Sequence, residues 1–272
     1  MEYSVLMSVY AKVAPEHFKT SVESMLDQTV PPAQFVLVCD GPLTPELDEV
    51  IEGFEDRLDV VRLAENVGPG CSRNRGLELC RCELVASMDS DDISLPDRFM
   101  LQERYMDEHP EVDILGGAIH EFNDEGTLSN ICRYPATMHE VLRTMYKASP
   151  LAHPTVMFRS SFFKAGFRYS SKYHICEDVT MWYDAAAGGR VINNMTDVLL
   201  DFRRNPSVLR RRSREKAWSE FLAYNDGISR LYGRFSYKYI YSFMRMCFRL
   251  MPTSLVSLIY DSKLRRIFAR HG

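Results

Sequence analysis

The sequence lacks several features that would assign it to a specialised class of protein. No basic flank precedes the first apolar stretch, Tyr3 to Tyr10, so we expect no signal peptide. The seven cysteines are scattered, and the close pair Cys80 and Cys82 has neither zinc-knuckle nor redox-motif spacing. There is also no internal repeat and no low-complexity linker. Reduced thiols in a cytoplasmic protein are therefore the simplest interpretation.

The composition is that of a globular protein with an uneven distribution of charge. With 272 residues and 46% hydrophobic content, the chain can form one large domain, or one domain with an appendage. The net charge is −4, but from Arg203 onward there are sixteen Lys/Arg and four Asp/Glu, a net charge of +12. The preceding residues therefore carry −16. This asymmetry suggests that the tail meets an anionic partner.

Short apolar runs alternate with helical patterns over the first part of the chain. The apolar runs predict strands at 4–9, 35–39, 58–63 and 83–88, and the periodic segments between them predict helices at about 15–26, 45–54 and 70–79. Such alternation predicts parallel βαβ units, whose ligands bind beyond the carboxyl ends of the strands. Tyr10, Asp40, Asn66 and Asp89 all follow predicted strands.

The later segments are less regular. We expect a helix from Pro96 to about residue 109, a strand at 112–119, and a mixed region at 127–201 that includes a helix from about Glu177 to Ala187. Beyond Arg203 the pattern is helical, except around Arg210-Arg211-Arg212.

The run Asp89-Ser90-Asp91-Asp92 directly follows a buried strand. Carboxylates are the hard oxygen ligands that Mg2+ and Mn2+ prefer, and a nucleotide diphosphate would complete the coordination of the metal. The alternative is an Asp-rich helix N-cap, which is common. The position after an apolar strand favours the metal site.

An ordered set of motifs carries a family resemblance. The set is Ser8-Val9-Tyr10, Asp40-Gly41, Asn66-x-Gly68 with Ser72-Arg73-Asn74-x-Gly76, Asp89-Ser90-Asp91-Asp92, His153-Pro154-Thr155-Val156-Met157 and Glu177-Asp178. Over about the first 205 residues the chain resembles glycosyltransferase family 2, and its opening is similar to a branch that builds bacterial capsule, exopolysaccharide and O-antigen repeat units. It departs from the common family form at Val9, where proline is frequent, and at Tyr10-Ala11, where asparagine often follows.

The resemblance implies an α/β protein with the GT-A fold, a Rossmann-like, mostly parallel sheet flanked by helices. It implies a catalytic domain at 1–205, with a nucleotide-sugar half at 1–120 and an acceptor half at 121–205. Residues 206–272 would form a basic, amphipathic helical extension. The implied activity is transfer of a hexose from a UDP-sugar to a saccharide acceptor, often lipid-linked, in cell-surface polysaccharide biosynthesis.

On the donor side, the resemblance implies that Val9, Tyr10 and Asp40 hold the nucleotide base, with Asn66 nearby. A carboxylate that accepts a hydrogen bond from uracil favours a UDP-sugar. Arg73 would lie near the nucleotide and Asp89 near the ribose or donor sugar. Asp91, with Asp89 as a second candidate, would ligate Mn2+ or Mg2+. The alternatives are that Asp40 is a turn residue and that Arg73 is a surface arginine paired with Glu78.

On the acceptor side, the resemblance implies an inverting displacement, which needs one general base. That base would be Asp178, with Glu177 as the alternative. An acidic first helical turn favoured by the helix dipole is the competing interpretation. Trp182 lies one turn after Asp178 and either stacks on the acceptor sugar or belongs to the core. His153, also on the acceptor side, is expected to have a structural role or to face a phosphate. It is not expected to be a metal ligand.

The tail contains a helical stripe of Lys238, Ser242, Arg245 and Arg249 beside a wide apolar face. This pattern predicts a helix that docks on an anionic membrane surface, which would make the protein peripheral on the inner face of the cell membrane. A second segment, Leu255 to Arg270, is also basic. The alternatives are a helix packed on the catalytic domain and one packed against a partner in a homodimer. Arg210-Arg211-Arg212-Ser213-Arg214 could also close over the diphosphate as a mobile loop, and the alternative is a solvated or membrane-facing run of charge.

Two other classes of protein share part of this pattern. A sugar nucleotidyltransferase would carry a Gly-rich phosphate loop with a lysine near the N-terminus, and Tyr10-Ala11-Lys12 does not provide one. A nucleic-acid-binding protein would act through the arginine cluster, but the acidic body does not support it, so we expect no nucleic-acid partner.

Overall fold

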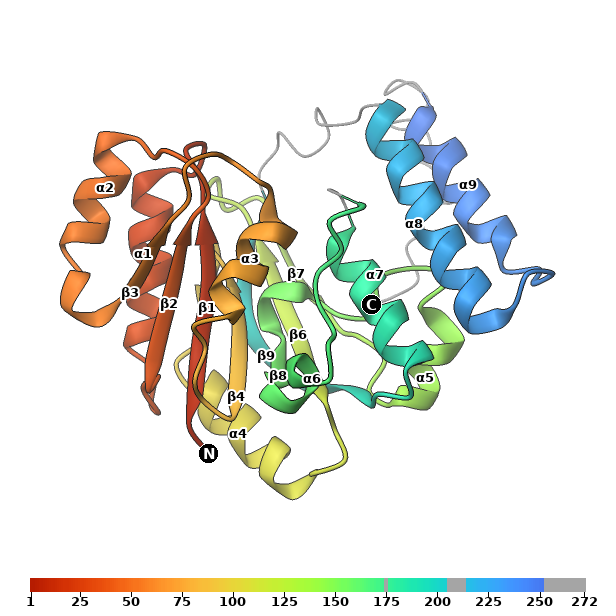
Figure 1. The fold of residues 1–272 in the computed structure, drawn as a ribbon, viewed down its shortest axis with the longest axis horizontal. Helices are drawn as coiled ribbons and strands as arrows, with labels where there is room; N and C mark the ends of the chain where they lie inside the picture. The colour runs from red at the N-terminus through yellow and green to blue at the C-terminus, as the bar shows by residue number, and fades with distance from the viewer. Residues whose placement is uncertain (174–175, 205–213, 252–272) are drawn as a thin grey trace.

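The computed structural model describes residues 1–173, 176–204 and 214–251 (Figure 1). The arginine cluster at 210–212 and the second basic segment at 255–270 lie outside the described residues.

Four parallel strands form the first half of the sheet, in the order β3-β2-β1-β4. Helices join successive strands along the chain, as the alternation predicts. The elements are β1 (Tyr3–Val9), α1 (Pro15–Leu26), β2 (Gln34–Cys39), α2 (Pro45–Glu52), η1 (Glu55–Arg57), β3 (Asp59–Arg62), α3 (Pro69–Leu77) and β4 (Leu84–Asp89). The expected parallel βαβ units are confirmed.

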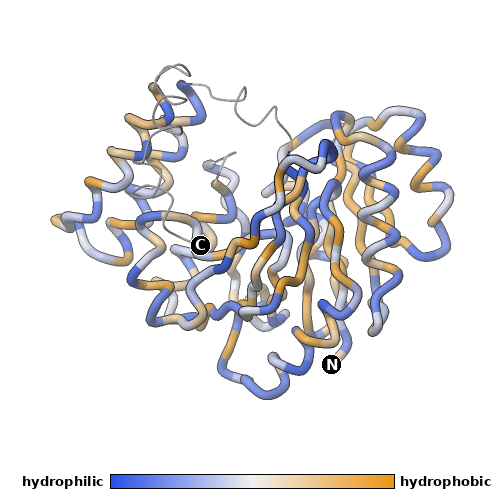
Figure 2. Tube along the Cα trace, turned by 180° about the vertical axis from the view of Figure 1, so that it is seen from behind, coloured by the Kyte–Doolittle hydropathy of each residue, from blue (hydrophilic) through white to orange (hydrophobic). Residues whose placement is uncertain are grey.

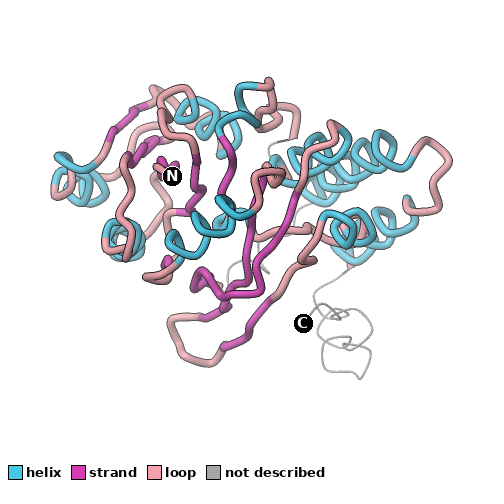
Figure 3. The backbone as a smooth tube through the Cα atoms, turned by 90° about the horizontal axis from the view of Figure 1, so that it is seen from below, coloured by secondary structure: helices cyan, strands magenta, loops and turns pink. Residues whose placement is uncertain are grey.

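Helices cover both faces of this half of the sheet, as the view from below makes visible (Figure 3). Side chains alternate along β1, so Val5 and Met7 join the core under α1 and α2, while Leu6 joins the core under α3. Burial on both faces explains why β1, β2 and β4 are rich in apolar residues, whereas β3, at the edge of the sheet, is only partly buried.

The second half of the chain continues the same sheet with mixed pairing. Its elements are β5 (Ile93–Ser94), α4 (Arg98–Glu108), β6 (Ile114–Phe122), β7 (Ser129–Cys132), α5 (Met138–Thr144), η2 (His153–Thr155), β8 (Met157–Arg159), α6 (Ser160–Lys164), α7 (Glu177–Ala187) and β9 (Ile192–Arg203). β8 is antiparallel to both β4 and β6, whereas β9 runs parallel to β6. The bounds of α7 are those expected from the sequence, and the predicted α/β fold class is confirmed.

The tail forms two helices, α8 (Arg214–Tyr232) and α9 (Tyr239–Leu250), which lie side by side at the end of the molecule away from α2 (Figure 1). The polar stripe of α9 faces the protein. Ser242 is 1% exposed, and Arg245 and Arg249 both contact the buried carboxylate of Glu220 on α8. Two of the cations that the sequence suggests as the edge of a membrane-docking helix, Arg245 and Arg249, are therefore paired with Glu220 inside the protein.

Candidate active site

The carboxyl ends of β1, β2 and β4 meet at one edge of the sheet. Val9 is paired in register with Cys39, and Ser8 with Asp89. The residues that follow these strands, Tyr10 and Asp40, therefore lie beside the aspartate run. The convergence expected from the sequence is present in the structure.

Asp40 braces the loop that precedes α3. Its Oδ1 accepts a hydrogen bond from the Val67 backbone N–H at 2.8 Å, and its Oδ2 accepts one from the Gly68 N–H at 3.1 Å. Asn66 Nδ2 in turn donates to the Asp40 carbonyl at 3.0 Å. Because a carboxylate oxygen can accept two hydrogen bonds, Asp40 retains acceptor capacity beyond this brace.

Gly41 permits this close approach of the two loops. Its φ is +85°, and a Cβ at this position would lie 2.7 Å from the Asn66 backbone nitrogen. Val9 helps to position Asp40, because the Val9 carbonyl accepts a hydrogen bond from the Asp40 N–H. The Val9 side chain is completely buried. It therefore offers no surface to a base, whereas Tyr10 is partly exposed.

The three aspartates after β4 have different environments. Asp89 Oδ1 accepts a hydrogen bond from Arg73 Nη2 at 2.7 Å and lies 3.8 Å from His153 Nδ1. Burial opposes ionisation of Asp89, but the neighbouring His153 and Arg73 hold its pKa below the usual range. Asp89 is therefore a paired carboxylate.

Asp92 connects the end of β4 to the end of β9 through a hydrogen bond. Its Oδ1 accepts from the Arg203 N–H at 2.8 Å, and Arg203 Nε donates to the Asp91 carbonyl at 2.9 Å. Burial and the charges of Asp89 and Asp91 raise the pKa of Asp92. The helix-cap interpretation of this run is wrong, because the short strand β5 follows it and α4 begins only at Arg98.

Asp91 is the member of the run with an available carboxylate. It is half-buried, and apart from a hydrogen bond to its own backbone its side chain has no hydrogen-bond or ion-pair partner within residues 1–173, 176–204 and 214–251. Burial and the charge of Asp89 raise its pKa. A hard oxygen donor in this position fits a divalent cation. The described residues contain no group of three or more His, Cys, Asp or Glu arranged to hold a metal unaided.

The Ser72-Arg73-Asn74 motif on α3 connects three parts of the site. Ser72 Oγ lies 2.8 Å from Ser8 Oγ, and Asn74 makes two hydrogen bonds with the backbone of Tyr169. Between them, Arg73 donates to Asp89 and, through Nη1, to Glu177 Oε1 at 3.0 Å. The motif therefore joins the first strand, the aspartate run and α7.

Arg73 is only 8% exposed, so its alternative assignment as a surface arginine is wrong. The exposed pair on α3 is Arg75 with Glu78, at 3.8 Å. Burial opposes the charge of Arg73, but Asp89 and Glu177 raise its pKa above the ordinary value, so the guanidinium stays charged.

The acidic pair at the start of α7 divides into one occupied and one available carboxylate. Glu177 is buried against Arg73, and burial together with the charge of Asp178 raises its pKa. Asp178 is partly exposed and makes no side-chain hydrogen bond or ion pair within the described part of the chain. Cys176, just before the pair, has a φ of +72°, a strained conformation for a residue other than glycine.

Trp182 and His153 do not form an open acceptor platform. Trp182 has no exposed surface and stacks on Phe158, with ring centroids 5.9 Å apart. Its expected stacking on a sugar is therefore wrong, and the core interpretation is correct. His153 is 7% exposed and its Nε2 lies 2.8 Å from the Tyr169 hydroxyl, so it belongs to the network behind Asp89.

Two supporting residues were not anticipated from the sequence. Tyr169 contacts His153, and its ring lies 5.7 Å from the Arg73 guanidinium. Arg98 is completely buried under the aspartate run, where its Nη2 donates to the Ser87 carbonyl at 2.9 Å and burial lowers its pKa to about 9. Neither residue lies in a motif, so no local signal identifies it.

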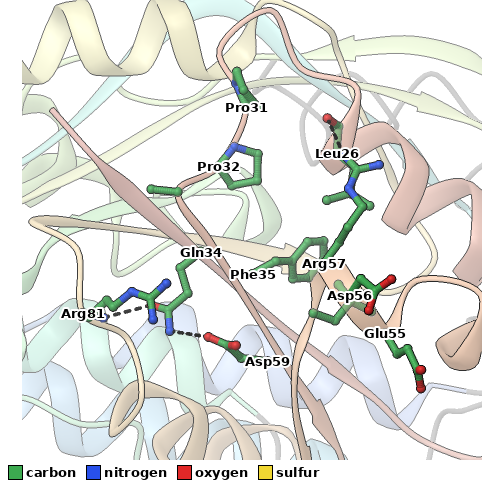
Figure 4. A pocket seen from close by; sticks show the side chains of 12 residues that line it. Leu26, Pro31, Pro32, Gln34, Phe35, Glu55, Asp56, Arg57, Asp59 and Arg81 are labelled. Atoms are coloured by element: carbon green, nitrogen blue, oxygen red, sulfur yellow. Dashed lines mark hydrogen bonds between the residues drawn. The ribbon is translucent and has the colours of Figure 1, made fainter.

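A separate hollow lies at the opposite edge of the sheet, near the amino ends of β2 and β3 (Figure 4). Its polar wall contains Gln34, which donates to Asp59 at 2.7 Å and accepts from the Arg81 N–H at 3.0 Å. Because these groups satisfy one another, and because the hollow lies away from the strand ends that carry the aspartates, we do not assign it to the site.

The sequence matches a known protein family and several of its named members. The sequence model of the family described as Glycosyl transferase family 2 matches residues 4–174. The chain is 32% identical to the amylovoran biosynthesis glycosyltransferase AmsE of Erwinia amylovora, over 95% of this chain and 98% of that protein. It is 30% identical to the UDP-Gal:alpha-D-GlcNAc-diphosphoundecaprenol beta-1,3-galactosyltransferase of Escherichia coli, over 97% of each.

The fold is also similar to that of a solved structure, S. aureus TarS 1-349 in complex with UDP-GlcNAc. The TM-score is 0.67 at 21% identity, and the match covers 98% of this chain and 78% of that chain. At this level of identity the similarity concerns the fold.

Proposed function

This chain belongs to glycosyl transferase family 2 and is a glycosyltransferase of polysaccharide biosynthesis, and we propose that it moves a hexose from a UDP-sugar to a saccharide acceptor with inversion of the anomeric centre. The observation that carries the proposal is the double contact of Arg73, which joins Asp89 to the acidic pair that begins α7. In this proposal residues 1–120 hold the donor, residues 121–205 the acceptor, and residues 206–272 form the basic extension.

Asp178 is the proposed general base. Inversion by a single in-line displacement requires one group to take the proton from the acceptor hydroxyl as that oxygen attacks the anomeric carbon. The partial exposure of Asp178 and the absence of a partner for it among the described residues support this role. Glu177 is less suited, because its carboxylate is engaged by Arg73.

The leaving UDP is held on the opposite side of the reacting carbon. Asp91, with Asp89 beside it, would hold Mn2+ or Mg2+, and such an ion neutralises charge that develops on the diphosphate when it is bound. Asp40 keeps lone pairs that can accept the uracil N–H, and Tyr10 and Asn66 lie at the same edge. Asp89 faces the ribose or the donor sugar.

The acceptor we propose is a lipid-linked saccharide, with the protein peripheral on the inner face of the cell membrane. The Escherichia coli relative is named for a diphosphoundecaprenol-linked substrate, and its similarity extends over the basic tail as well as the catalytic part. The net charge of +12 from Arg203 onward favours electrostatic attraction of the tail to anionic lipid headgroups.

A donor screen tests the proposal. Purified full-length protein is incubated with UDP-hexoses and UDP-N-acetylhexosamines, with and without Mn2+, and release of UDP is measured. We expect one UDP-sugar to support release, with a marked requirement for the metal. Release of inorganic diphosphate from a nucleoside triphosphate and a sugar phosphate would instead identify a sugar nucleotidyltransferase, and salt-sensitive retention on DNA would favour nucleic-acid binding.

A further inference from the structure

The helix α9 is amphipathic, but its polar side faces the protein and its apolar side faces outward. On the inner side, Ser242 Oγ donates to Asn225 Oδ1 at 2.5 Å, and Arg249 Nη2 donates to Glu220 Oε1 at 3.1 Å. Arg245 also pairs with Glu220, at 3.4 Å, and because Glu220 is 4% exposed the two arginines neutralise a buried carboxylate. Breaking them would leave that charge unpaired, which strongly disfavours rotation of α9 about its axis.

The opposite side of α9 is a stripe of large apolar side chains. Ile240, Phe243, Met244 and Leu250 follow helical spacing, and each is between 47% and 55% exposed. On α8, Trp218 is 54% exposed. A hollow between the two helices is lined by Arg214, Trp218, Met246 and Leu250. We name this set, Trp218, Ile240, Phe243, Met244 and Leu250, the outer face.

Large exposed hydrophobic side chains are concentrated on and around the outer face. Of the twelve large hydrophobic side chains that are exposed among the described residues, eight belong to α8, α9 or the loop between them. Phe235 and Tyr237, on that loop, are 102% and 70% exposed. Hydrophobic segments recur along both helices at the edge of the molecule (Figure 2). An exposed apolar patch of this kind marks an interaction surface.

We propose that the outer face inserts into the surface of an anionic lipid leaflet. The proposal rests on the proposed function, because a lipid-linked acceptor requires the enzyme to work at a membrane. It identifies the inserting side of α9 as the side opposite the Lys238–Arg249 stripe. None of the helices in the described ranges is long and apolar enough to cross a bilayer, so insertion is limited to the interface.

Charge complementarity favours lipid over a second copy of the chain as the occupant. The exposed cations Arg214 and Arg234 lie at the start of α8 and on the α8–α9 loop. The sequence after residue 251 adds four Lys/Arg and one acid. A second copy would bring the same positive charge and repel it, whereas anionic headgroups attract it.

The same helices connect the outer face to the proposed base. α8 packs directly on α7, where Gly227 allows an approach so close that a Cβ would lie 2.3 Å from the Tyr183 ring. The rings of Tyr183 and Tyr224 lie 6.0 Å apart in the same contact. A leaflet that meets the outer face is therefore held at a set distance from Asp178, which begins α7.

Vesicle flotation tests the proposal with full-length protein. Vesicles contain either phosphatidylcholine alone or phosphatidylcholine with phosphatidylglycerol. We expect the wild-type chain to float with the anionic vesicles, and the triple variant Ile240→Ser/Phe243→Ser/Met244→Ser to lose roughly tenfold or more of this partitioning. The matched control Met100→Ser/Ile131→Ser removes exposed apolar side chains outside the outer face and should float like the wild type.

Three results would overturn the proposal: a triple variant that floats as well as the wild type, a wild-type chain that ignores anionic vesicles, or a vesicle-free dimer that the triple variant dissociates. UDP affinity, measured by calorimetry, shows whether each variant is folded. Failure of the donor screen with normal flotation would contradict the proposed function alone. Normal UDP release to a water-soluble acceptor without flotation would contradict the membrane inference alone.

Discussion

Arg73 Nη2 lies 2.7 Å from Asp89 Oδ1 in the interior of the site. The other arm of the same guanidinium reaches Glu177, which lies 104 residues further along the chain than Arg73. One side chain from α3 therefore positions both the aspartate run after β4 and the acidic turn of α7. Gly70 leaves room for this contact, since a Cβ there would lie at a tight 3.1 Å from the Glu177 side chain.

Replacing Arg73 with methionine should destabilise the protein strongly. The change leaves Asp89 and Glu177 as buried carboxylates without their cation, and removal of one partner of a buried ion pair costs about 3–5 kcal/mol. Urea unfolding gives the free energy directly. The control, Arg75→Met, removes an exposed arginine of the same helix and should change stability by about 0.5 kcal/mol or less. Equal stability of the two variants would mean that the Arg73 bridge is not important for the fold.

Asp178→Asn should abolish sugar transfer while leaving UDP affinity nearly unchanged. The amide cannot take the proton from the acceptor hydroxyl, and loss of a general base lowers turnover by about 100- to 10,000-fold. Turnover is measured as UDP release with acceptor present, and binding by calorimetry. Glu177→Gln is the comparison, because it alters the residue held by Arg73 and should reduce stability as well as turnover. Turnover close to wild type in Asp178→Asn would exclude this residue as the base.

Asp91→Ala should remove the metal dependence of UDP binding. The carboxylate is the member of the aspartate run without a partner side chain among the described residues, so its loss would remove the proposed metal ligand without unpairing another group. Calorimetric titration of UDP with and without Mn2+ measures the effect. Asp48→Ala, which removes the partner of the exposed Arg62, is the control and should keep the metal dependence. An Asp91→Ala protein that still binds UDP more tightly with Mn2+ would contradict the assignment.

Gly41→Ala should weaken UDP binding and lower stability. The added Cβ meets the Asn66 backbone at 2.7 Å and the residue has a positive φ, so the loop braced by Asp40 must move. We expect a loss of about 1–3 kcal/mol in unfolding free energy. Gly126→Ala provides a matched control, since its φ is also positive but nothing lies within 4 Å of the new Cβ. If the two variants lose the same stability and bind UDP equally, close approach at Gly41 is not important.

The local pattern is sufficient for the regular elements and for the position of the aspartate run at the carboxyl end of β4. The strands that lead to Asp40 and Asp89 are continuous apolar segments, and the helix from Glu177 to Ala187 ends at a glycine pair, so each can be recognised within a short window. Trp182 could not be assigned in this way. A tryptophan one turn after Asp178 has the same sequence pattern whether its ring meets Phe158 or a sugar.

By itself, the sequence determined the alternating strands and helices, the acidic residues that follow the strands, and the amphipathic character of α9, because each depends on residues close together in the chain. Only the tertiary structure decided that Arg73 pairs with Asp89 and Glu177, that Asp91 and Asp178 keep available carboxylates, and that α9 presents its apolar side outward. Each of these depends on how side chains that are distant in sequence are arranged. For α9 that partner is Glu220, whose buried charge requires the inward-facing arginines.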